Sequence, residues 1–553
     1  MDRKKRILCG IAIAVIVFGI GTGGTLSYLH KESANKLSAS ENSSDSSIGE
    51  EKKSDNEKNV MNEEQKEIFK KVRATYDPEA QAAIAESITQ EKSEGSYTAD
   101  NMLIKYNPFG SNTQSMYVYF TTEEPVSVSY TIHVENEEIN DFTQQISEGQ
   151  METDHEFQII GLIPNTTNTI KFTLTKEDGI EETHETTYEM GDIYGEEELV
   201  LEKEVLQEDA SLEDGLYVIL GNDSSSMDFM YYYDNQGVLR GEVPILGYRS
   251  HRLLFRDGFM YYSISERKIA QVNKLGQVTN VYQLGDYKLH HDYVFDSSDN
   301  LLVLATDTTQ DSVEDIVLKL NPTTGEVSEL LDLGDLMGDY KETCVKNSSD
   351  ELDWAHVNTI QYVGDDSVLL SSRETSSILK IDHLSGNPQI EYIISDKEVW
   401  EDTAYEDLVL DKVGDFTIQG GQHTITYETD DSLAEGQYYL YMFNNNIGYS
   451  ETRPDFNWED LDLTNTSGVK GDTSYYYKYL VDEKAGTFEL VDSFEVPYSG
   501  YVSSVQDLNG HTIVDSGLQG TFTEYDSNHK AIVTFTMDTE KFIYRVFKYE
   551  FSY

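Results

Sequence analysis

The stretch SILKIDHLSGNPQIEYII, residues 377–394, contains the pattern on which the fold prediction depends. Apolar and polar residues alternate on both sides of LSGN, and a period of two is typical of β-strands. Glycine and asparagine supply the positive backbone φ angles that tight turns between strands need. The stretch therefore predicts a β-hairpin.

The same strand–turn–strand pattern recurs through the C-terminal part of the chain. The other copies are MYYYDNQGVLRGEV (230–243), KIAQVNKLGQVTNVYQL (268–284), DIVLKLNPTTGEVSELLDL (315–333), YKYLVDEKAGTFELVDSFEV (477–496) and FTEYDSNHKAIVTFTM (522–537). Together the six hairpins predict an all-β fold, a six-bladed β-propeller over residues 210–553 with one hairpin in each blade. A large β-sandwich or a β-helix is the alternative that the same strands allow.

A second group of strands precedes these repeats. Four segments alternate with period two, which predicts a small antiparallel β-sandwich: SMYVYFTT (115–122), VSVSYTIHV (126–134), HEFQIIGL (155–162) and NTIKFTLTKE (168–177). Helical sequence comes before them, EEQKEIFKKVRATY and then DPEAQAAIAESITQEK, whose Asp and Pro are typical of a helix N-terminus. We assign residues 76–195 to this N-terminal domain. Its sequence leaves open whether it shapes the channel mouth or mediates formation of a homodimer.

The N-terminus has the pattern of a membrane anchor. The basic stub MDRKK precedes an apolar run at residues 7–29 that is long enough to cross a bilayer. Because positive charges stay in the cytoplasm, residues 1–30 are predicted to be a signal anchor, or a signal peptide if they are cleaved. The polar residues 31–75 are predicted to be a disordered tether, whose end overlaps the first helical segment. We therefore expect an extracytoplasmic protein anchored to the cell membrane.

The composition limits the classes of partner and site. The chain has 553 residues, with 41 Lys and Arg against 101 Asp and Glu, so its formal charge is −60. Such a charge argues against nucleic acid as a partner, and it requires any site for an anion to be locally basic. Only Cys9 and Cys344 occur, which leaves no disulfide framework or cysteine-based metal site. Acidic turns such as DTTQDSVED lack the spacing of a calcium loop.

Histidines occur near the start of three strands that are candidates for the innermost position in a blade. These strands are KLHHDYVFDSSDNLLVLA with His290 and His291, AHVNTIQYVGDDSVLLSS with His356 and Asn358, and GGQHTITYETDD with His423. Innermost strands face the central channel of a propeller, so equivalent histidines should converge there. Each histidine taken alone is explained as well by a structural hydrogen bond, but three equivalent positions beside Arg373 favour a functional site.

The residue types at this site favour an anion over a metal. Three histidines are compatible with zinc, but a guanidinium from Arg373 beside a divalent cation is unfavourable. Histidine, arginine and asparagine together provide donors for a tetrahedral oxyanion such as sulfate or phosphate. One imidazole can act as a nucleophile, and the others can donate hydrogen bonds or transfer protons.

Three strings of the chain, in their order on a six-bladed pattern, resemble the bacterial aryl-sulfate sulfotransferase family. They are HHDYVFDSSDNLLVLA, DWAHVNTIQYVGDDSVLLSSRETSSILKID and GGQHT. NMLIKYNPFGSNTQSMYVYFTTEEPVSVSYTI resembles the small β-domain of that family. The resemblance covers about residues 75–553. It implies a transferase that moves a sulfuryl group from a phenolic sulfate ester to a phenolic acceptor. It also implies a ping-pong mechanism through a sulfohistidine, with no cofactor, no metal and no nucleotide donor (PAPS).

The resemblance also implies roles for particular residues. His423 matches the nucleophile, and His356 and Arg373 match the groups that hold the sulfuryl oxygens. The pair His290 and His291 matches the remaining catalytic histidine, with His291 preferred because HHDYVF aligns with QHTITY. Further substrate-binding donors are expected at two positions, Asn358 and Ser503. Unlike better-known members, the chain has no cysteine pair near the site.

Two other functions fit the same residues. A sulfatase-like or phosphatase-like hydrolase would use water as the acceptor, whereas a non-catalytic propeller on the cell surface would turn nothing over. The complete histidine set disfavours the non-catalytic propeller, whereas the hydrolase differs from the transferase in forming product without added phenol. The natural donor and acceptor phenols depend on the pocket walls, which the sequence pattern does not identify.

Overall fold

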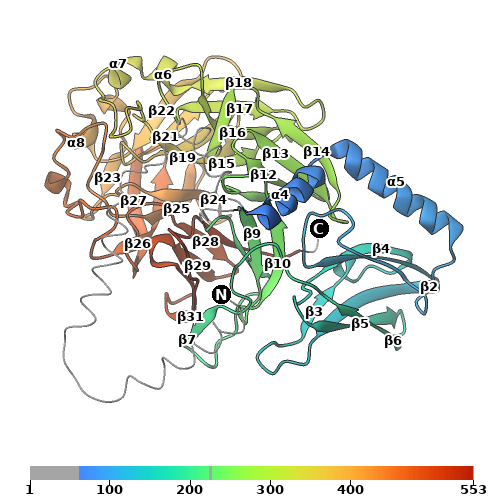
Figure 1. Ribbon diagram of the computed structural model, residues 1–553. Helices are drawn as coiled ribbons and strands as arrows, with labels where there is room; N and C mark the ends of the chain where they lie inside the picture. The colour runs from blue at the N-terminus through green and yellow to red at the C-terminus, as the bar shows by residue number, and fades with distance from the viewer. Residues whose placement is uncertain (1–61, 223–226, 552–553) are drawn as a thin grey trace. The chain divides into compact units, whose positions relative to one another are not determined.

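The computed structural model describes residues 62–222 and 227–551 (Figure 1). The predicted membrane anchor at residues 1–30 lies outside the described residues, as does the tether up to residue 61. No helix in the described part of the chain is both long and apolar enough to span a bilayer.

Two helices open the described chain, α4 (Glu63–Thr75) and α5 (Pro78–Glu94). Asn62 caps α4 by accepting a hydrogen bond from Gln65 N at 2.9 Å, while the Gln65 side chain accepts one from Asn62 N. Asp77 caps α5 by accepting hydrogen bonds from Glu79 N and Ala80 N, and Pro78 stands in the first turn. The prediction of a disordered tether over residues 31–75 is therefore wrong for residues 63–75, because the capping box and the amphipathic sequence IFKKV start a helix there.

The N-terminal β-domain is built around one long strand. β2 pairs with β1 and β4 through its first half and with β3 and β5 through its second half, and β6 extends the sheet beyond β5. Phe157 of β4 packs against Phe172 of β5, with ring centroids 6.3 Å apart, so the two halves enclose a core. The strands are β1 (Leu103–Tyr106), β2 (Ser115–His133), β3 (Phe142–Gln145), β4 (Glu152–Ile160), β5 (Thr167–Lys176) and β6 (Glu181–Glu189).

Six further sheets, each of four or five strands, account for the strands described between residues 202 and 549. Blade 1 contains β8 (Leu216–Ile219), β9 (Phe229–Tyr233), β10 (Leu239–Pro244) and β32 (Val546–Tyr549). Blade 2 contains β11 (Leu253–Arg256), β12 (Phe259–Ser265), β13 (Lys268–Asn273) and β14 (Val278–Gln283). Blade 3 contains β15 (Tyr287–Phe295), β16 (Leu301–Asp307), β17 (Ile316–Leu320) and β18 (Val327–Asp332).

The remaining blades follow the same order along the chain. Blade 4 contains β19 (Val357–Gly364), β20 (Ser367–Ser372), β21 (Ser377–Asp382) and β22 (Gln389–Ile394). Blade 5 contains β23 (Asp411–Val413), β24 (His423–Glu428), β25 (Gln437–Asn444), β26 (Ser474–Asp482) and β27 (Thr487–Val496). Blade 6 contains β28 (Ser504–Leu508), β29 (His511–Ser516), β30 (Thr521–Tyr525), β31 (Ala531–Thr536) and β7 (Glu202–Val205). Short helices lie between blades: α6 (Leu333–Leu336), α7 (Gly338–Lys341) and α8 (Lys397–Trp400).

The innermost strands make a closed ring. β15, β19, β24, β28 and β32 are neighbours in that order, and Phe255 of β11 packs edge-on against Tyr549 of β32. The Tyr293 hydroxyl of β15 donates to the carbonyl of Arg252, just before β11, which completes the ring. The six-bladed β-propeller predicted from the hairpins is therefore confirmed, with each quoted hairpin in a different blade.

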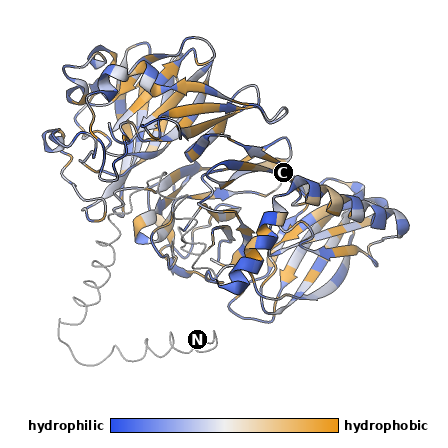
Figure 2. Cartoon of the chain, turned by 45° about the horizontal axis from the view of Figure 1, so that its top comes forward, coloured by the Kyte–Doolittle hydropathy of each residue, from blue (hydrophilic) through white to orange (hydrophobic). Residues whose placement is uncertain are grey.

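Two strands from opposite ends of the chain close the propeller. β32, near the C-terminus, forms the innermost strand of blade 1 beside β8, and β7, before the first blade, forms the outermost strand of blade 6 beside β31. Orange apolar residues run through the strands in Figure 2, among white and blue ones, and the buried apolar side chains fill the spaces between blades. A buried leucine, isoleucine or phenylalanine contributes about 1.5–3 kcal/mol, so this packing dominates the stability of the fold.

Candidate active site

Apart from Arg373, which directly follows β20, the predicted site residues lie on the innermost strands or directly before them. His356 immediately precedes β19, His423 is the first residue of β24, and Ser503 immediately precedes β28. His290 and His291 differ from the prediction because they lie within β15, where the pairing with β16 shifts between Leu289 and Tyr293. This bulge re-aims two consecutive side chains that a regular strand would direct to opposite faces.

Backbone strain gathers at the same places. Non-glycine residues with positive φ include His291 (52°), Glu314 (59°), His356 (44°), Thr424 (55°) and Ser503 (84°). Such conformations cost of order 1–3 kcal/mol each, and they persist where the surrounding structure holds them for a function. Positive φ angles also occur at turns elsewhere in the described residues, but these five lie at the histidines or near them, which supports this part of the propeller as the candidate site.

His423 is held in one tautomer. Its Nδ1 lies 2.8 Å from Asn445 Oδ1 and 3.0 Å from the Gly421 carbonyl, and both of these atoms only accept hydrogen bonds. The Asn445 amide is oriented in turn, because its Nδ2 donates to the carbonyls of Ser499 and Val502. The proton of a neutral His423 is therefore on Nδ1, and Nε2 carries the lone pair.

The electrostatics of the site keep His423 neutral. Burial lowers the pKa of His423 to about 3; the hydrogen bond that His423 donates to Asn445 opposes this shift, whereas the positive charges of Arg373, His356 and Arg545 add to it. An imidazole in this state is a nucleophile at any pH near neutrality.

The segment GGQH places His423 through close packing. Gly421 has φ of +60°, and a Cβ on it would meet the Ile447 side chain, while a Cβ on Gly420 would lie 2.6 Å from the Ile447 carbonyl oxygen. Gln422 then joins blades 4 and 5, because its Nε2 donates to Ser371 Oγ at 3.0 Å. The two glycines are needed for this approach of backbone to backbone.

His356 has the opposite charge state. Its Nδ1 lies 2.6 Å from Asp353 Oδ2 and 3.0 Å from Glu314 Oε2. Burial works against the charged ring, but Asp353 and Glu314 outweigh it and hold the pKa of His356 well above its ordinary value, despite the charge of Arg373. His356 is therefore a cation with Nε2–H as its remaining donor.

His291 lies beside both His356 and His290. Its ring centroid is 4.8 Å from that of His356, and its Nδ1 is 3.0 Å from Nδ1 of His290 and 3.6 Å from Glu314 Oε2. Burial lowers the pKa of His291 well below its ordinary value, and the charges of the neighbouring histidines, His423 included, add to the shift. Of the two consecutive histidines, His291 is the one whose ring lies beside His356.

Arg373 supplies a permanent positive charge beside His356. Its backbone N–H donates to the His356 carbonyl at 3.1 Å, and its guanidinium is 3.7 Å from Glu374. The side chain is 23% exposed, so part of it contacts solvent. Burial works to lower the pKa of Arg373, but nearby carboxylates, Glu374 foremost, raise it.

Asn358 and Ser503 are buried, and their side chains bond mainly to protein. Asn358 Nδ2 donates to the Gln422 carbonyl at 2.8 Å, which fixes the residue directly before His423. Ser503 Oγ donates to Ser499 Oγ and accepts from Gly517 N. These contacts give both residues a positioning role within and between blades.

Several residues of the site were missed in the sequence analysis. Asp353, Glu314 and Asn445 set the charge or tautomer of the histidines, as described above. His251 is fully buried just before β11, with its ring centroid 6.4 Å from that of His291, and burial lowers its pKa well below the ordinary value. Arg545 joins three blades, since its guanidinium donates to the carbonyls of His251 and Asn358 and pairs with Asp292 at 3.3 Å. Only His251 had a usable signal, because SHRLLF places it directly before an innermost strand.

Comparisons with solved structures found distant likenesses. The structures include the nidogen/laminin complex (9% identity, 60% of this chain and 97% of that chain, TM-score 0.36) and the WD40 domain of Toxoplasma gondii coronin (9%, 61% and 76%, 0.29). The C-terminal WD40 domain of Sif2 is 7% identical, and the match covers 60% of this chain and 70% of that chain with a TM-score of 0.29. At these scores the likeness adds nothing to the fold assignment, which rests on the six sheets. A search of curated proteins found no match.

Comparison with protein families gives a direct result. The family described as Arylsulfotransferase (ASST) matches residues 202–546, from β7 to the start of β32, and the Arylsulfotransferase Ig-like domain matches residues 103–191, which contain β1 to β6. The first match covers more than half of the chain, and the two together confirm the resemblance noted in the sequence. The chain therefore belongs to the arylsulfotransferase family, and its general activity is that of an aryl sulfotransferase.

Proposed function

We propose that the protein transfers a sulfuryl group from a phenolic sulfate ester to a second phenol by a ping-pong mechanism, with the group carried on Nε2 of His423 between the two steps. The observation that carries this proposal is the fixed tautomer of His423, whose Nδ1–H faces Gly421 O and Asn445 Oδ1. A neutral, oriented imidazole with its lone pair on Nε2 is the arrangement that nucleophilic catalysis needs.

In the first step Nε2 attacks sulfur, an N–S bond forms, and the S–O bond to the phenol breaks with its electron pair on the phenolate. The ring becomes positive as the bond forms, because it keeps the proton on Nδ1. Asn445 Oδ1 and the Gly421 carbonyl stabilise that charge directly. The aryl sulfate itself supplies the activated group, so the scheme needs no PAPS.

The sulfuryl oxygens need positive groups that are already in place. Arg373 and the cationic His356 provide them, and their mutual orientation is supported by the hydrogen bond from Arg373 N to the His356 carbonyl. Asp353 and Glu314 keep His356 charged through contacts with Nδ1, so Nε2–H remains as a donor to a sulfuryl oxygen. Removing one such donor typically costs about 2.7–4 kcal/mol of barrier.

In the second step the acceptor phenol attacks the sulfohistidine and must lose its proton. His291 is the best-placed base, since it lies beside His356 and its low pKa keeps it neutral. By reversibility the same residue protonates the departing phenolate in the first step. Because its pKa is low, only a small fraction of His291 carries the proton that this step needs. Donors whose phenols leave readily as phenolates should therefore react fastest.

The test is the release of nitrophenolate from 4-nitrophenyl sulfate by the full chain, with and without phenol, alongside His423→Ala. We expect release that depends on phenol and is lost in His423→Ala. His383→Asn is the matched control, because His383 is exposed with φ of 60° in the outer hairpin of blade 4. Mass spectrometry after mixing with the donor alone should find the sulfuryl group on His423.

Equal release with and without phenol would instead show a hydrolase. No release from a range of aryl sulfates, or sulfation at a residue other than His423, would refute the mechanism.

A further inference from the structure

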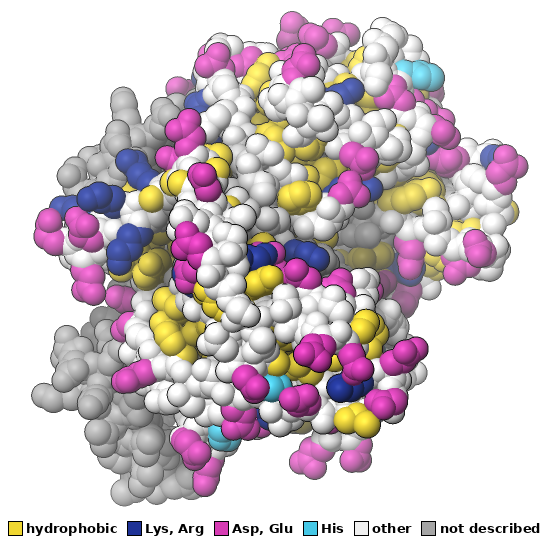
Figure 3. All heavy atoms as spheres, turned by 90° about the vertical axis from the view of Figure 1, so that its right-hand side faces the viewer, with side chains coloured by type: hydrophobic (Ala, Val, Ile, Leu, Met, Phe, Trp, Pro, Cys, Tyr) yellow, Lys and Arg dark blue, Asp and Glu magenta, His cyan; other side chains and the backbone are white. Residues whose placement is uncertain are grey.

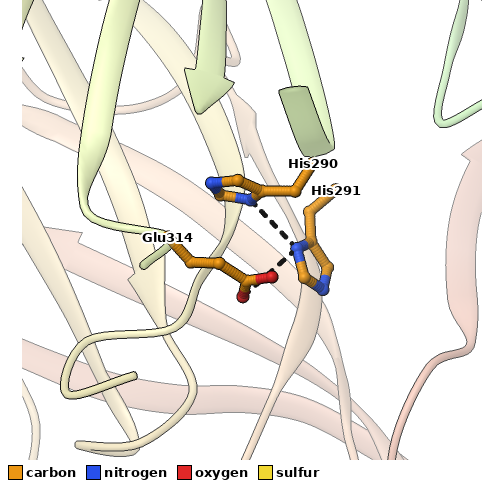
Figure 4. A group of neighbouring side chains, drawn as sticks. All are labelled: His290, His291 and Glu314. Carbon is orange, nitrogen blue, oxygen red and sulfur yellow. Dashed lines mark hydrogen bonds and ion pairs between the residues drawn. The ribbon is translucent and has the colours of Figure 1, made fainter. Parts of the chain in front are cut away.

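The histidine pair of β15 and Glu314 converge on one point, as Figure 4 shows. His290 Nδ1 and His291 Nδ1 are 3.0 Å apart, Glu314 Oε2 is 3.6 Å from His291 Nδ1, and the three donor atoms all lie within 4.8 Å of one another. All three side chains are at least nine-tenths buried. The strained backbone at His291 and Glu314 brings these groups together, although consecutive strand residues normally diverge.

We propose that His290, His291 and Glu314 form a binding site for a divalent transition metal ion of the Zn²⁺ class. Two imidazoles and one carboxylate are a common ligand set for zinc with an open fourth position. With Zn–N distances of about 2.0–2.1 Å, tetrahedral ligand atoms are about 3.3 Å apart. The separations of 3.0 and 3.6 Å lie on either side of that value.

The surroundings hold the ligands in place. Glu314 is anchored through its backbone, whose N–H donates to Thr306 Oγ1 at 2.9 Å and whose carbonyl accepts from Val357 N at 3.1 Å. The Tyr544 hydroxyl donates to the His291 carbonyl at 3.3 Å. Such outer contacts orient metal ligands, and they are part of a built site.

The overlapping group Glu314, Asp353 and His356 is a weaker candidate for the ion. His356 is charged there by its two carboxylates, and a protonated imidazole does not bind a metal. The objection that Arg373 repels a cation is weakened by the geometry, because the contacts of Arg373 are with His356 and Glu374, whereas the ion would lie between His290, His291 and Glu314. Glu314 contributes the negative charge that the ion needs.

The metal site has a consequence for catalysis, which rests on the proposed function. Glu314 Oε2 is 3.0 Å from His356 Nδ1, so an ion that takes this oxygen competes with the contact that orients His356. It also occupies His291, the proposed base. The bound ion should therefore inhibit transfer, and a chelator should restore it.

The experiment measures metal binding without reference to turnover. The full chain is stripped with EDTA and titrated with ZnCl₂ by calorimetry, and the visible absorption of the Co²⁺ form is recorded. We expect one ion per chain, and binding at least tenfold weaker in both His290→Ala and Glu314→Gln. The matched control is His133→Ala, because exposed His133 lies beside Asp141 and Glu135 and represents an adventitious surface site.

Lack of stoichiometric binding in the wild type would overturn the proposal, and so would unchanged affinity in His290→Ala and Glu314→Gln. In that case the two imidazoles share a proton at 3.0 Å. Circular dichroism of each variant excludes unfolding as the cause of lost binding. Zinc binding with no aryl sulfate turnover under any condition would refute the proposed function and leave the metal site standing.

Discussion

At the scale of single residues, Asn445 decides the state of the proposed nucleophile. Its Oδ1 accepts from His423 Nδ1–H, and it is locked by two donations to backbone carbonyls. Asn445→Asp places a carboxylate against Nδ1, which raises the pKa of His423, so the variant must lose a proton before attack. We expect its transfer rate to rise with pH across neutrality while the wild-type rate does not.

Asn445→Ala separates orientation from charge. It removes the acceptor without adding a carboxylate, so we expect a loss of about 10²-fold in kcat without a new pH dependence. Initial rates with 4-nitrophenyl sulfate and phenol between pH 5.5 and 8.5 distinguish the two variants. Identical pH profiles for Asn445→Asp and Asn445→Ala would show that Asn445 does not control the protonation of His423.

The low pKa of His423 also makes the fold sensitive to acid. Its pKa falls from 6.5 to about 3 on folding, so below pH 6.5 the unfolded chain binds a proton that the folded chain excludes. Stability is therefore lost as the pH falls from 6.5 toward 3, and at pH 5 the loss is about 2 kcal/mol. His423→Asn keeps a donor for Asn445 without a titrating ring.

We expect the difference in the free energy of unfolding between pH 7 and pH 5 to be about 2 kcal/mol smaller in His423→Asn than in the wild type, as measured by urea denaturation. His356 should have the opposite effect, because its pKa is raised on folding. Protonated His356 stabilises the fold at a pH below its pKa in the unfolded chain, and this stabilisation is lost as the pH rises through its pKa in the folded chain. Equal acid sensitivity of wild type and His423→Asn would contradict a pKa near 3.

Part of this site could be predicted from the sequence and part could not. His356 and His423 were identifiable because they stand at repeated places relative to strands whose alternation is a local signal, and Arg373 because it follows the strand next to that of His356. Asp353, Glu314 and Asn445 gave no such signal, since each acts across a turn or between strands through contacts that depend on the folded backbone. The bulge in β15 was also hidden, because a register shift depends on the partner strand.

At the scale of elements, the loop before β24 delivers His423, and its two glycines are the sensitive points. Gly421→Ala adds a Cβ against Ile447 at φ of +60°, so we expect the loop to move and transfer to fall by at least tenfold. Gly510→Ala is the matched control, because Gly510 has φ of +89° and no atom near its added Cβ. It carries only the cost of the left-handed conformation, about 1–2 kcal/mol.

Transfer rates and melting temperatures of both variants check this prediction. Gly421→Ala should lose activity out of proportion to its loss of stability, whereas Gly510→Ala should lose stability alone. If both variants keep full activity, the close packing at Ile447 is not what places His423.

The same scale shows which elements the sequence could predict. The six outer hairpins were recognised because each pairs neighbours in the chain, with the turn residues between them. The closing strands β7 and β32 were not, because each pairs with a strand more than 300 residues away. Only the geometry of the complete ring assigns them to blades 6 and 1.

At the scale of the whole molecule, the net charge opposes the charge of the proposed donor. The chain carries −60, and Figure 3 shows Asp and Glu side chains spread over the visible face, while Arg373 and His356 make the site basic only locally. An aryl sulfate anion is therefore repelled at long range and attracted at short range. Salt screens the long-range part first, because buried charges are screened much less.

We expect kcat/KM for the aryl sulfate donor to rise when sodium chloride is increased from about 10 to about 150 mM, where the Debye length falls from about 30 to about 8 Å. The corresponding constant for an uncharged phenol acceptor should stay the same, which makes the acceptor the internal control in a ping-pong scheme. A fall in the donor constant would mean that the positive charge of the channel governs the approach of the donor despite the acidic surface. Equal changes for donor and acceptor would point to an effect of salt on the protein itself, so the contrast between the two substrates carries the test.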